Sequence, residues 1–233
     1  MKNQTHLAPL PGALAGERGG QMSVAQVAGV FGLAAAVTLV SIAWVDRPVA
    51  VWAHGSLEPY RSLFVALTHI VDPIPVIAGG ACLVYAVLAL CGYTPGPRGR
   101  VALRIALAVV VAIYLKDGLK GLAGRSWPET WTAGNPSYFR DGVYGFFPWQ
   151  GFNGTRAFQA FPSGHMTAVS SGAVGFALAY PRWRMLALAA VVAVAVGLVG
   201  ADFHWVSDVI AGTLLGSSVA LAAYRVHRRF YAE

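Results

Sequence analysis

Long blocks of apolar residues without Asp, Glu, Lys or Arg recur along this 233-residue chain, and polar connections separate them. The uncharged stretches are 19–45, 73–97, 105–115, 166–181, 185–201 and 209–224. A helix needs about 20 mostly apolar residues to cross a membrane. The first two stretches reach this length, and the other four reach it once flanking polar residues at the membrane edge are included. The pattern therefore predicts six membrane-spanning helices.

The predicted fold is an all-α, polytopic membrane helix bundle. Segment 48–72 mixes aromatic and apolar residues with isolated charges, which is typical of a helix that lies in the membrane interface. Residues 1–21 are expected to form a flexible cytoplasmic tail, which leaves 22–233 as one membrane-embedded domain. No short apolar core with a cleavage site follows Met1, so we expect no removed signal peptide. The expected spans are 23–45, 73–92, 101–122, 163–180, 183–201 and 204–225.

Charge is scarce but asymmetrically placed. Only 12% of residues are charged, about half the share in soluble domains, while the formal net charge is +7. Basic residues favour the cytoplasmic side of a membrane. We therefore expect cytoplasmic termini, a long outer connection after the third span, a location in the cell (inner) membrane, and no nucleic-acid partner. The arginines that set this orientation lie in alternate connections: Arg98, Arg100, Arg104, Arg182, Arg184, Arg225, Arg228 and Arg229.

The stretch Phe161–His165, with the sequence FPSGH, marks the start of a helix on the outer side. Pro162 disfavours a helical residue before it, and Ser163 is a good helix N-cap. The first turn then has free backbone N–H groups and the positive end of the helix dipole, which suit a phosphate. His165 in that turn can exchange a proton with the bound anion.

A second outer helix start carries His204 and Asp208, which are four residues apart and therefore adjacent on a helix. A carboxylate that binds one imidazole nitrogen leaves the other nitrogen basic and oriented, which makes a nucleophile. Ionisable groups this close to hydrocarbon favour a functional interpretation. A structural His–Asp pair is the alternative. A zinc site is a further one, but it has no good third ligand.

Basic residues gather around the third connection. Lys116 and Lys120 are four apart, on one face of a helix, and the alternative to a functional role is that they reach the membrane edge as snorkelling lysines. The connection 123–161 also contains Arg125, Arg140 and Arg156. Long connections in compact proteins are often functional, so we expect this one to fold over the outer face.

Together these residues resemble the type-2 phosphatidic acid phosphatase superfamily of integral membrane lipid phosphatases. The motifs of that superfamily are KxxxxxxRP, PSGH and SRxxxxxHxxxD, and the resemblance covers roughly residues 70–225. Pro162–His165 match the second motif, and His204 and Asp208 match the third. In the first motif Lys120 and Pro128 match. The remaining positions depart, because Trp127 and Leu198 stand where the family has arginines and Gly197 stands where it has serine.

The resemblance implies hydrolysis of a lipid phosphate without a metal ion or cofactor. It implies that His204 attacks phosphorus to form a phosphohistidine, that Asp208 orients His204, and that His165 protonates the leaving oxygen and then activates water. Phosphate binding is implied for Lys120 and for the N–H groups of Ser163 and Gly164. To replace the missing arginines we expect first Arg125, then Arg140, then Arg156, with Lys116 also available.

Two alternatives stay open from the sequence: a lipid phosphotransferase, and a catalytically weak protein that binds or translocates a lipid phosphate. Phosphatidate, phosphatidylglycerophosphate, polyprenyl (di)phosphates and lipid A phosphates all fit as substrates. The expected partners are the lipid-phosphate substrate and membrane lipids, and the sequence indicates no oligomeric state.

Overall fold

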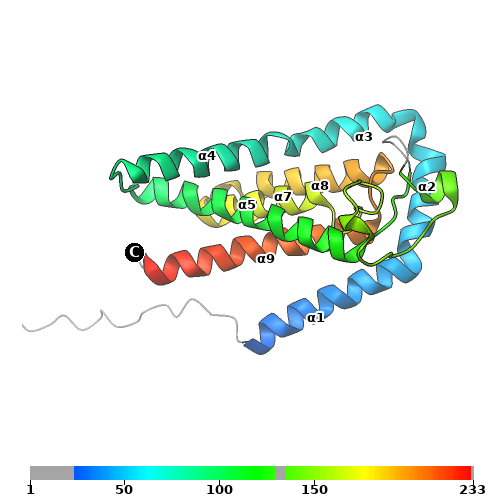
Figure 1. Ribbon diagram of the computed structural model, residues 1–233, viewed down its shortest axis with the longest axis horizontal. Coiled ribbons are helices and arrows are strands. Elements are labelled where there is room, and N and C mark those ends of the chain that lie inside the picture. The colour runs from blue at the N-terminus through cyan, green and yellow to red at the C-terminus, as the bar shows by residue number, and fades with distance from the viewer. Residues whose placement is uncertain (1–23, 130–134, 232–233) are drawn as a thin grey trace, which may run out of the picture. The chain divides into compact units, whose positions relative to one another are not determined.

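The structure is a computed structural model that describes residues 24–129 and 135–231 (Figure 1). Contacts divide the chain into two units, with the boundary after Leu33. In the first unit the described residues form the start of helix α1 (Val24–Val40). The second unit contains all the other elements discussed below. The expected tail at 1–21 lies outside the described residues.

The described residues are helical apart from turns, loops and isolated β-bridges, which confirms the all-α expectation. The short helical turns are η1 (Ser41–Val45), η2 (Glu58–Tyr60), η3 (His69–Val71), η4 (Gln150–Phe152) and η5 (Pro181–Trp183). The α-helices after α1 are α2 (Asp46–Leu57), α3 (Arg61–Thr68), α4 (Pro73–Leu90), α5 (Pro97–Ala123), α6 (Tyr138–Asp141), α7 (Gly164–Ala179), α8 (Arg184–Gly200) and α9 (Val206–Phe230).

Three helical segments in the described part of the chain are long and apolar enough to cross a membrane. They are Gly29–Leu90, Pro181–Gly200 and Val206–Phe230. The first segment contains both the first and the second expected spans, joined by the short helical elements from η1 to η3. A π-helical turn at Ser41–Val45 leads directly into α2, and Pro48 falls in the first turn of α2, where a missing N–H costs nothing.

Two other predicted spans, which correspond to helices α5 and α7, are not among these three segments. Helix α5 is 27 residues long, but charged residues occupy both of its ends, among them Arg104 and Lys120. Helix α7 has 16 residues, because it starts only at Gly164, after its Ser163 cap. α7 packs against α5, α8 and α9, so it occupies the middle of the second unit.

Close approach of α7 and α9 brings two predicted site segments together. A Cβ atom added to Gly212 of α9 would lie 2.5 Å from the Ser163 carbonyl oxygen, and one added to Gly216 would collide with the Thr167 carbonyl. Only glycine allows the two backbones to approach this closely. As a result, the Ser163 N–H donates to the Asp208 carbonyl oxygen across 3.0 Å. The starts of α7 and α9 therefore lie side by side.

Candidate active site

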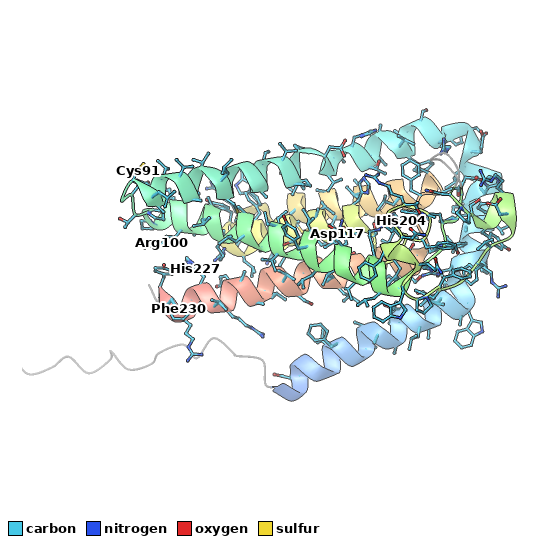
Figure 2. All side chains as sticks on the ribbon, in the orientation of Figure 1. Cys91, Arg100, Asp117, His204, His227 and Phe230 are labelled. Atoms are coloured by element: carbon cyan, nitrogen blue, oxygen red, sulfur yellow. The ribbon has the colours of Figure 1, made fainter. Side chains whose placement is uncertain are left out.

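A cavity of about 610 Å³ opens beside the first turn of α7. Its walls come from α3, η3, the start of α4, the end of α5, α7 and the outer connection. Six residues expected at the site line it: Lys116, Lys120, Arg156, Gly164, His165 and His204. Figure 2 shows His204 and Asp117, another lining residue, far from Cys91, Arg100, His227 and Phe230, which lie at the opposite end of the second unit.

His204 and Asp208 form the expected pair. His204 Nδ1 lies 3.2 Å from Asp208 Oδ2, and the same oxygen accepts the Trp205 N–H at 3.1 Å. The Asp208 side chain is fully buried, and His204 is 5% exposed where it meets the cavity. With an ionised Asp208, Nδ1 carries the proton and Nε2 is the basic nitrogen. The pair can therefore supply an oriented nucleophile.

Behind Asp208 lies a buried ion cluster. Arg125 Nη1 donates to Asp208 Oδ1 at 3.0 Å and to Ser207 Oγ at 2.5 Å, while Nη2 donates to Asp46 Oδ2 at 2.6 Å. Asp46 also accepts the Ser207 N–H at 2.9 Å. The Arg125 and Asp46 side chains have no exposed surface. Arg125 thus links two carboxylates, one of which orients His204.

The electrostatics of this cluster favour a charged Arg125. Burial works against the charge, but Asp208 and Asp46 outweigh burial and raise the pKa of Arg125 above its usual value. The rings of Phe146, Tyr144 and Trp205 surround the guanidinium, at 4.6 to 5.6 Å from its carbon. Arg125 does not line the cavity. Its placement does not support the expected role as a phosphate ligand, because its side chain is fully buried and its Nη1 and Nη2 groups donate to the two carboxylates.

Two other expected phosphate ligands also lie elsewhere or are already bonded. Arg140 is about half exposed, pairs with Asp141 at 3.1 Å and does not line the cavity. Ser163 is fully buried. Its N–H donates to the Asp208 carbonyl, and its hydroxyl accepts the Met166 N–H at the start of α7. Ser163 therefore links α7 to α9 as the expected N-cap, and of the PSGH residues Gly164 and His165 face the cavity.

The two lysines line the same cavity as the histidines. Lys120 is 7% exposed, and its ammonium donates to the Gln159 carbonyl and lies 5.3 Å from the centre of the Trp127 ring. The Lys116 ammonium is 2.5 Å from Asp117 Oδ1. A Cβ atom on Gly164 would lie 3.1 Å from the Lys116 side chain. The absence of a side chain at Gly164 thus leaves room for Lys116 beside the helix start.

The departures from the family motifs have structural counterparts. Leu198 is fully buried in an apolar core with Val71 and Met166. Leucine therefore packs well at the position where the family has arginine. At Gly197 an added Cβ would lie 2.7 Å from the Phe64 carbonyl oxygen of α3, which leaves no space for serine. Trp127 lines the cavity, with its ring 5.1 Å from that of His204.

Several residues at or next to the site were not found by sequence reasoning. Asp46 and Ser207 belong to the buried cluster, and Gln159 binds Lys120. Asp46 is 161 positions before its partner Ser207, and it marks only the end of an apolar stretch in the sequence. Among the described residues no group of three His, Cys, Asp or Glu side chains is arranged to hold a metal ion.

With this geometry in place, comparison with known proteins identifies the class. The model of the PAP2 superfamily, the phosphatases that the motifs resemble, matches residues 101–232. The chain belongs to the PAP2 superfamily. Given its apolar helices and its membrane-lipid phosphatase relatives, it is a membrane protein.

Individual relatives cover smaller parts. The chain is 36% identical over 121 residues to lipid A 1-phosphatases of Rhizobium etli and Rhizobium johnstonii, which is 52% of this chain and 48% and 46% of those proteins. It is 40% identical over 68 residues to an undecaprenyl-diphosphatase of Sulfolobus acidocaldarius, 29% of this chain and 33% of that protein. The chain thus spans about half the length of the two lipid A 1-phosphatases and about a third of the undecaprenyl-diphosphatase. No solved structure matches it.

Proposed function

We propose that this protein is an integral membrane lipid-phosphate phosphatase that hydrolyses a phosphomonoester or diphosphate through a phosphohistidine on His204. The observation that carries the proposal is the arrangement of His204. It is held by Asp208 at the wall of a cavity that His165, Lys116 and Lys120 also line. A nucleophile, an acid–base group and two cations therefore meet at one place, as phosphoryl transfer requires.

The proposed reaction has two steps. His204 Nε2 attacks phosphorus, the bond from phosphorus to the lipid oxygen breaks, and His165 gives its proton to that oxygen. His165 then takes a proton from water, the water oxygen attacks the phosphohistidine, and inorganic phosphate leaves with His204 restored. Lys116 and Lys120 and the backbone at Gly164 stabilise the negative charge on the phosphoryl oxygens. Arg140 has no part in this scheme, and Arg125 acts through Asp208.

The walls of the cavity suit an amphiphilic substrate. Val65, Val71, Pro75, Ile113 and Phe203 form an apolar part next to the basic groups. A phosphate can bind the lysines and histidines while the adjoining chain lies on the apolar surface. The names of the relatives, lipid A 1-phosphatase and undecaprenyl-diphosphatase, both denote enzymes that act on phosphorylated lipids. We infer that the substrate here is also a phosphorylated lipid.

We further propose the six-span arrangement, with the segment from α2 to η3 in the interface and the active site facing the periplasm or exterior. The arginine-containing connection near Arg100 lies at the end of the second unit opposite His204 (Figure 2). Since basic connections favour the cytoplasmic side, the cavity would open on the outer side.

Cysteine labelling tests this orientation. Gln150 is exposed in the outer connection, and the natural Cys91 is exposed at the turn between α4 and α5. In a Cys82→Ser background, Gln150→Cys with Cys91→Ser should react with an impermeant maleimide in intact cells, after permeabilisation of an outer membrane if one exists. The matched variant that keeps only Cys91 should react only after lysis. The opposite labelling pattern would reverse the proposed topology.

Phosphate release by purified protein tests the activity. We expect inorganic phosphate from at least one of phosphatidate, phosphatidylglycerophosphate, a polyprenyl diphosphate or lipid A 1-phosphate, with the rate unchanged by EDTA because side chains supply the positive charge. Loss of release in EDTA and its recovery with Mg²⁺ would contradict the metal-independent mechanism. Transfer of the phosphoryl group to an added lipid would indicate a phosphotransferase, and binding without release would indicate a binding or translocating protein.

A further inference from the structure

The side chain at the family's first arginine position has a different task in this protein. Trp127 is 5% exposed, and its indole Nε1–H donates to the Arg156 carbonyl oxygen at 2.7 Å. The two residues are 29 positions apart in sequence. The tryptophan that replaces the arginine thus fixes the backbone of another arginine at the cavity.

The segment around Arg156 is held on both sides. After it, the Gln159 carbonyl accepts the Lys120 ammonium, and the Gln159 side chain donates to the Gly151 carbonyl at 2.8 Å. Before it, the Asn153 side chain accepts both the N–H and the hydroxyl of Thr155, at 3.1 and 2.9 Å. The Lys120–Gln159 bond connects the segment to the end of α5, which carries the site lysine, and the other bonds hold the segment within the outer connection. The position of the Arg156 backbone is therefore determined by site residues.

Of the arginines in the described residues, Arg156 alone lines the cavity, and its side chain is largely exposed. It shares the cavity wall with Lys120, Trp127 and His204. Arg125, by contrast, forms ion pairs with the two buried carboxylates of Asp46 and Asp208, and Arg140 pairs with Asp141. The structure thus favours Arg156 as the phosphate-binding arginine, which sequence spacing ranks after Arg125 and Arg140.

We propose that Arg156 is the relocated phosphate-binding arginine of this protein, and that Trp127 is the residue that positions it. This inference rests on the proposed phosphatase function. A guanidinium can bind two phosphoryl oxygens at once through parallel N–H donors, and a lysine ammonium cannot reproduce that planar fork. Lys116 and Lys120 supply point charges. Arg156 supplies the bidentate contact that arginines would make at positions 127 and 198, where this protein has tryptophan and leucine.

Substitution of Arg156 tests the inference. Loss of a charged donor that acts in the transition state costs about 10²-fold to 10³-fold in turnover, so Arg156→Ala should lower kcat by about a hundredfold and Arg156→Lys should recover only part of it. Arg182→Ala, in the exposed turn η5 and not among the residues that line the cavity, is the matched control and should leave turnover unchanged. A fall of this size in the kcat of Arg140→Ala, with no fall in Arg156→Ala, would assign phosphate binding to Arg140 and overturn the proposal.

A double-mutant cycle tests the positioning role. Trp127→Phe keeps an aromatic ring but removes the N–H that holds Arg156, so it should raise KM and lower kcat in the wild-type background. In the Arg156→Ala background the same change should have little further effect, because the residue that Trp127 positions is already gone. Additive losses in the double variant would contradict positioning through Arg156.

Binding of orthovanadate separates failure of this inference from failure of the proposed function. Wild-type protein should bind orthovanadate, measured by calorimetry, and Arg156→Ala should bind it at least about tenfold more weakly. If the wild type releases phosphate and Arg156→Ala is unchanged in both turnover and binding, the inference is wrong and the phosphatase proposal stands. If the wild type releases no phosphate, the proposed activity fails and the binding comparison still decides the role of Arg156.

Discussion

His204→Ala is expected to abolish phosphate release from every lipid phosphate that the wild-type protein hydrolyses. The imidazole is the group that forms the covalent bond to phosphorus, and water at the same place lacks both its nucleophilicity and its orientation by Asp208. Removal of a catalytic nucleophile typically costs about 10⁴-fold or more in turnover. Single-turnover assays with lipid phosphate measure the loss.

Two controls separate chemistry from folding. His227→Ala removes an imidazole at the opposite end of the second unit (Figure 2) and should leave turnover unchanged. The melting temperature of His204→Ala should stay close to that of the wild type, because in the described structure the imidazole makes one side-chain hydrogen bond, at 3.2 Å to Asp208, and borders the cavity. Wild-type turnover in a folded His204→Ala protein would show that His204 is not the nucleophile.

The second large effect is expected at Arg125. Arg125→Ala would leave Asp46 and Asp208 as neighbouring buried carboxylates without their shared cation. Breaking a buried ion pair by removing one partner typically costs about 3–5 kcal/mol. We therefore expect a large fall in the free energy of unfolding, with loss of activity because Asp208 no longer holds His204 in place.

Arg125→Lys and Arg140→Ala complete this experiment. A single ammonium cannot reach Asp46, Ser207 and Asp208 with the geometry of a guanidinium, so the lysine variant should regain only part of the stability. Arg140 forms a partly exposed pair with Asp141, for which a loss of about 0–1 kcal/mol is typical. Thermal or denaturant unfolding in detergent measures all three. A melting curve of Arg125→Ala like that of the wild type would contradict the structural role.

The parts of the fold and site that could be predicted from sequence depend on local patterns. The uncharged stretches predicted a helical protein, and the proline and serine before Gly164 predicted where α7 begins, which the Ser163 cap confirms. The spacing of His204 and Asp208 predicted their contact, although His204 lies in the turn just before α9, whose N-cap is Trp205, and not on the helix itself.

What could not be predicted depends on tertiary packing. Arg125 lies two positions from the usual motif arginine, yet it points to Asp46 and Asp208 because α5 ends at Gly124, in a left-handed conformation, just before it. No sequence signal connects Asp46 to residues about 80 and 160 positions away. Arg156 reaches the cavity because Trp127 and Lys120 bind its segment, which spacing alone does not reveal.

Trapping of the covalent intermediate tests whether His204 is the nucleophile. Purified protein is mixed with a ³²P-labelled lipid phosphate, quenched in alkaline denaturant, which preserves phosphohistidine, and digested for mass spectrometry. We expect a phosphoryl group on the peptide that contains His204, located on that residue and absent from His204→Ala. Phosphate release without any phosphoryl group on His204, or a phosphoryl group on a different residue, would show that His204 is not the nucleophile.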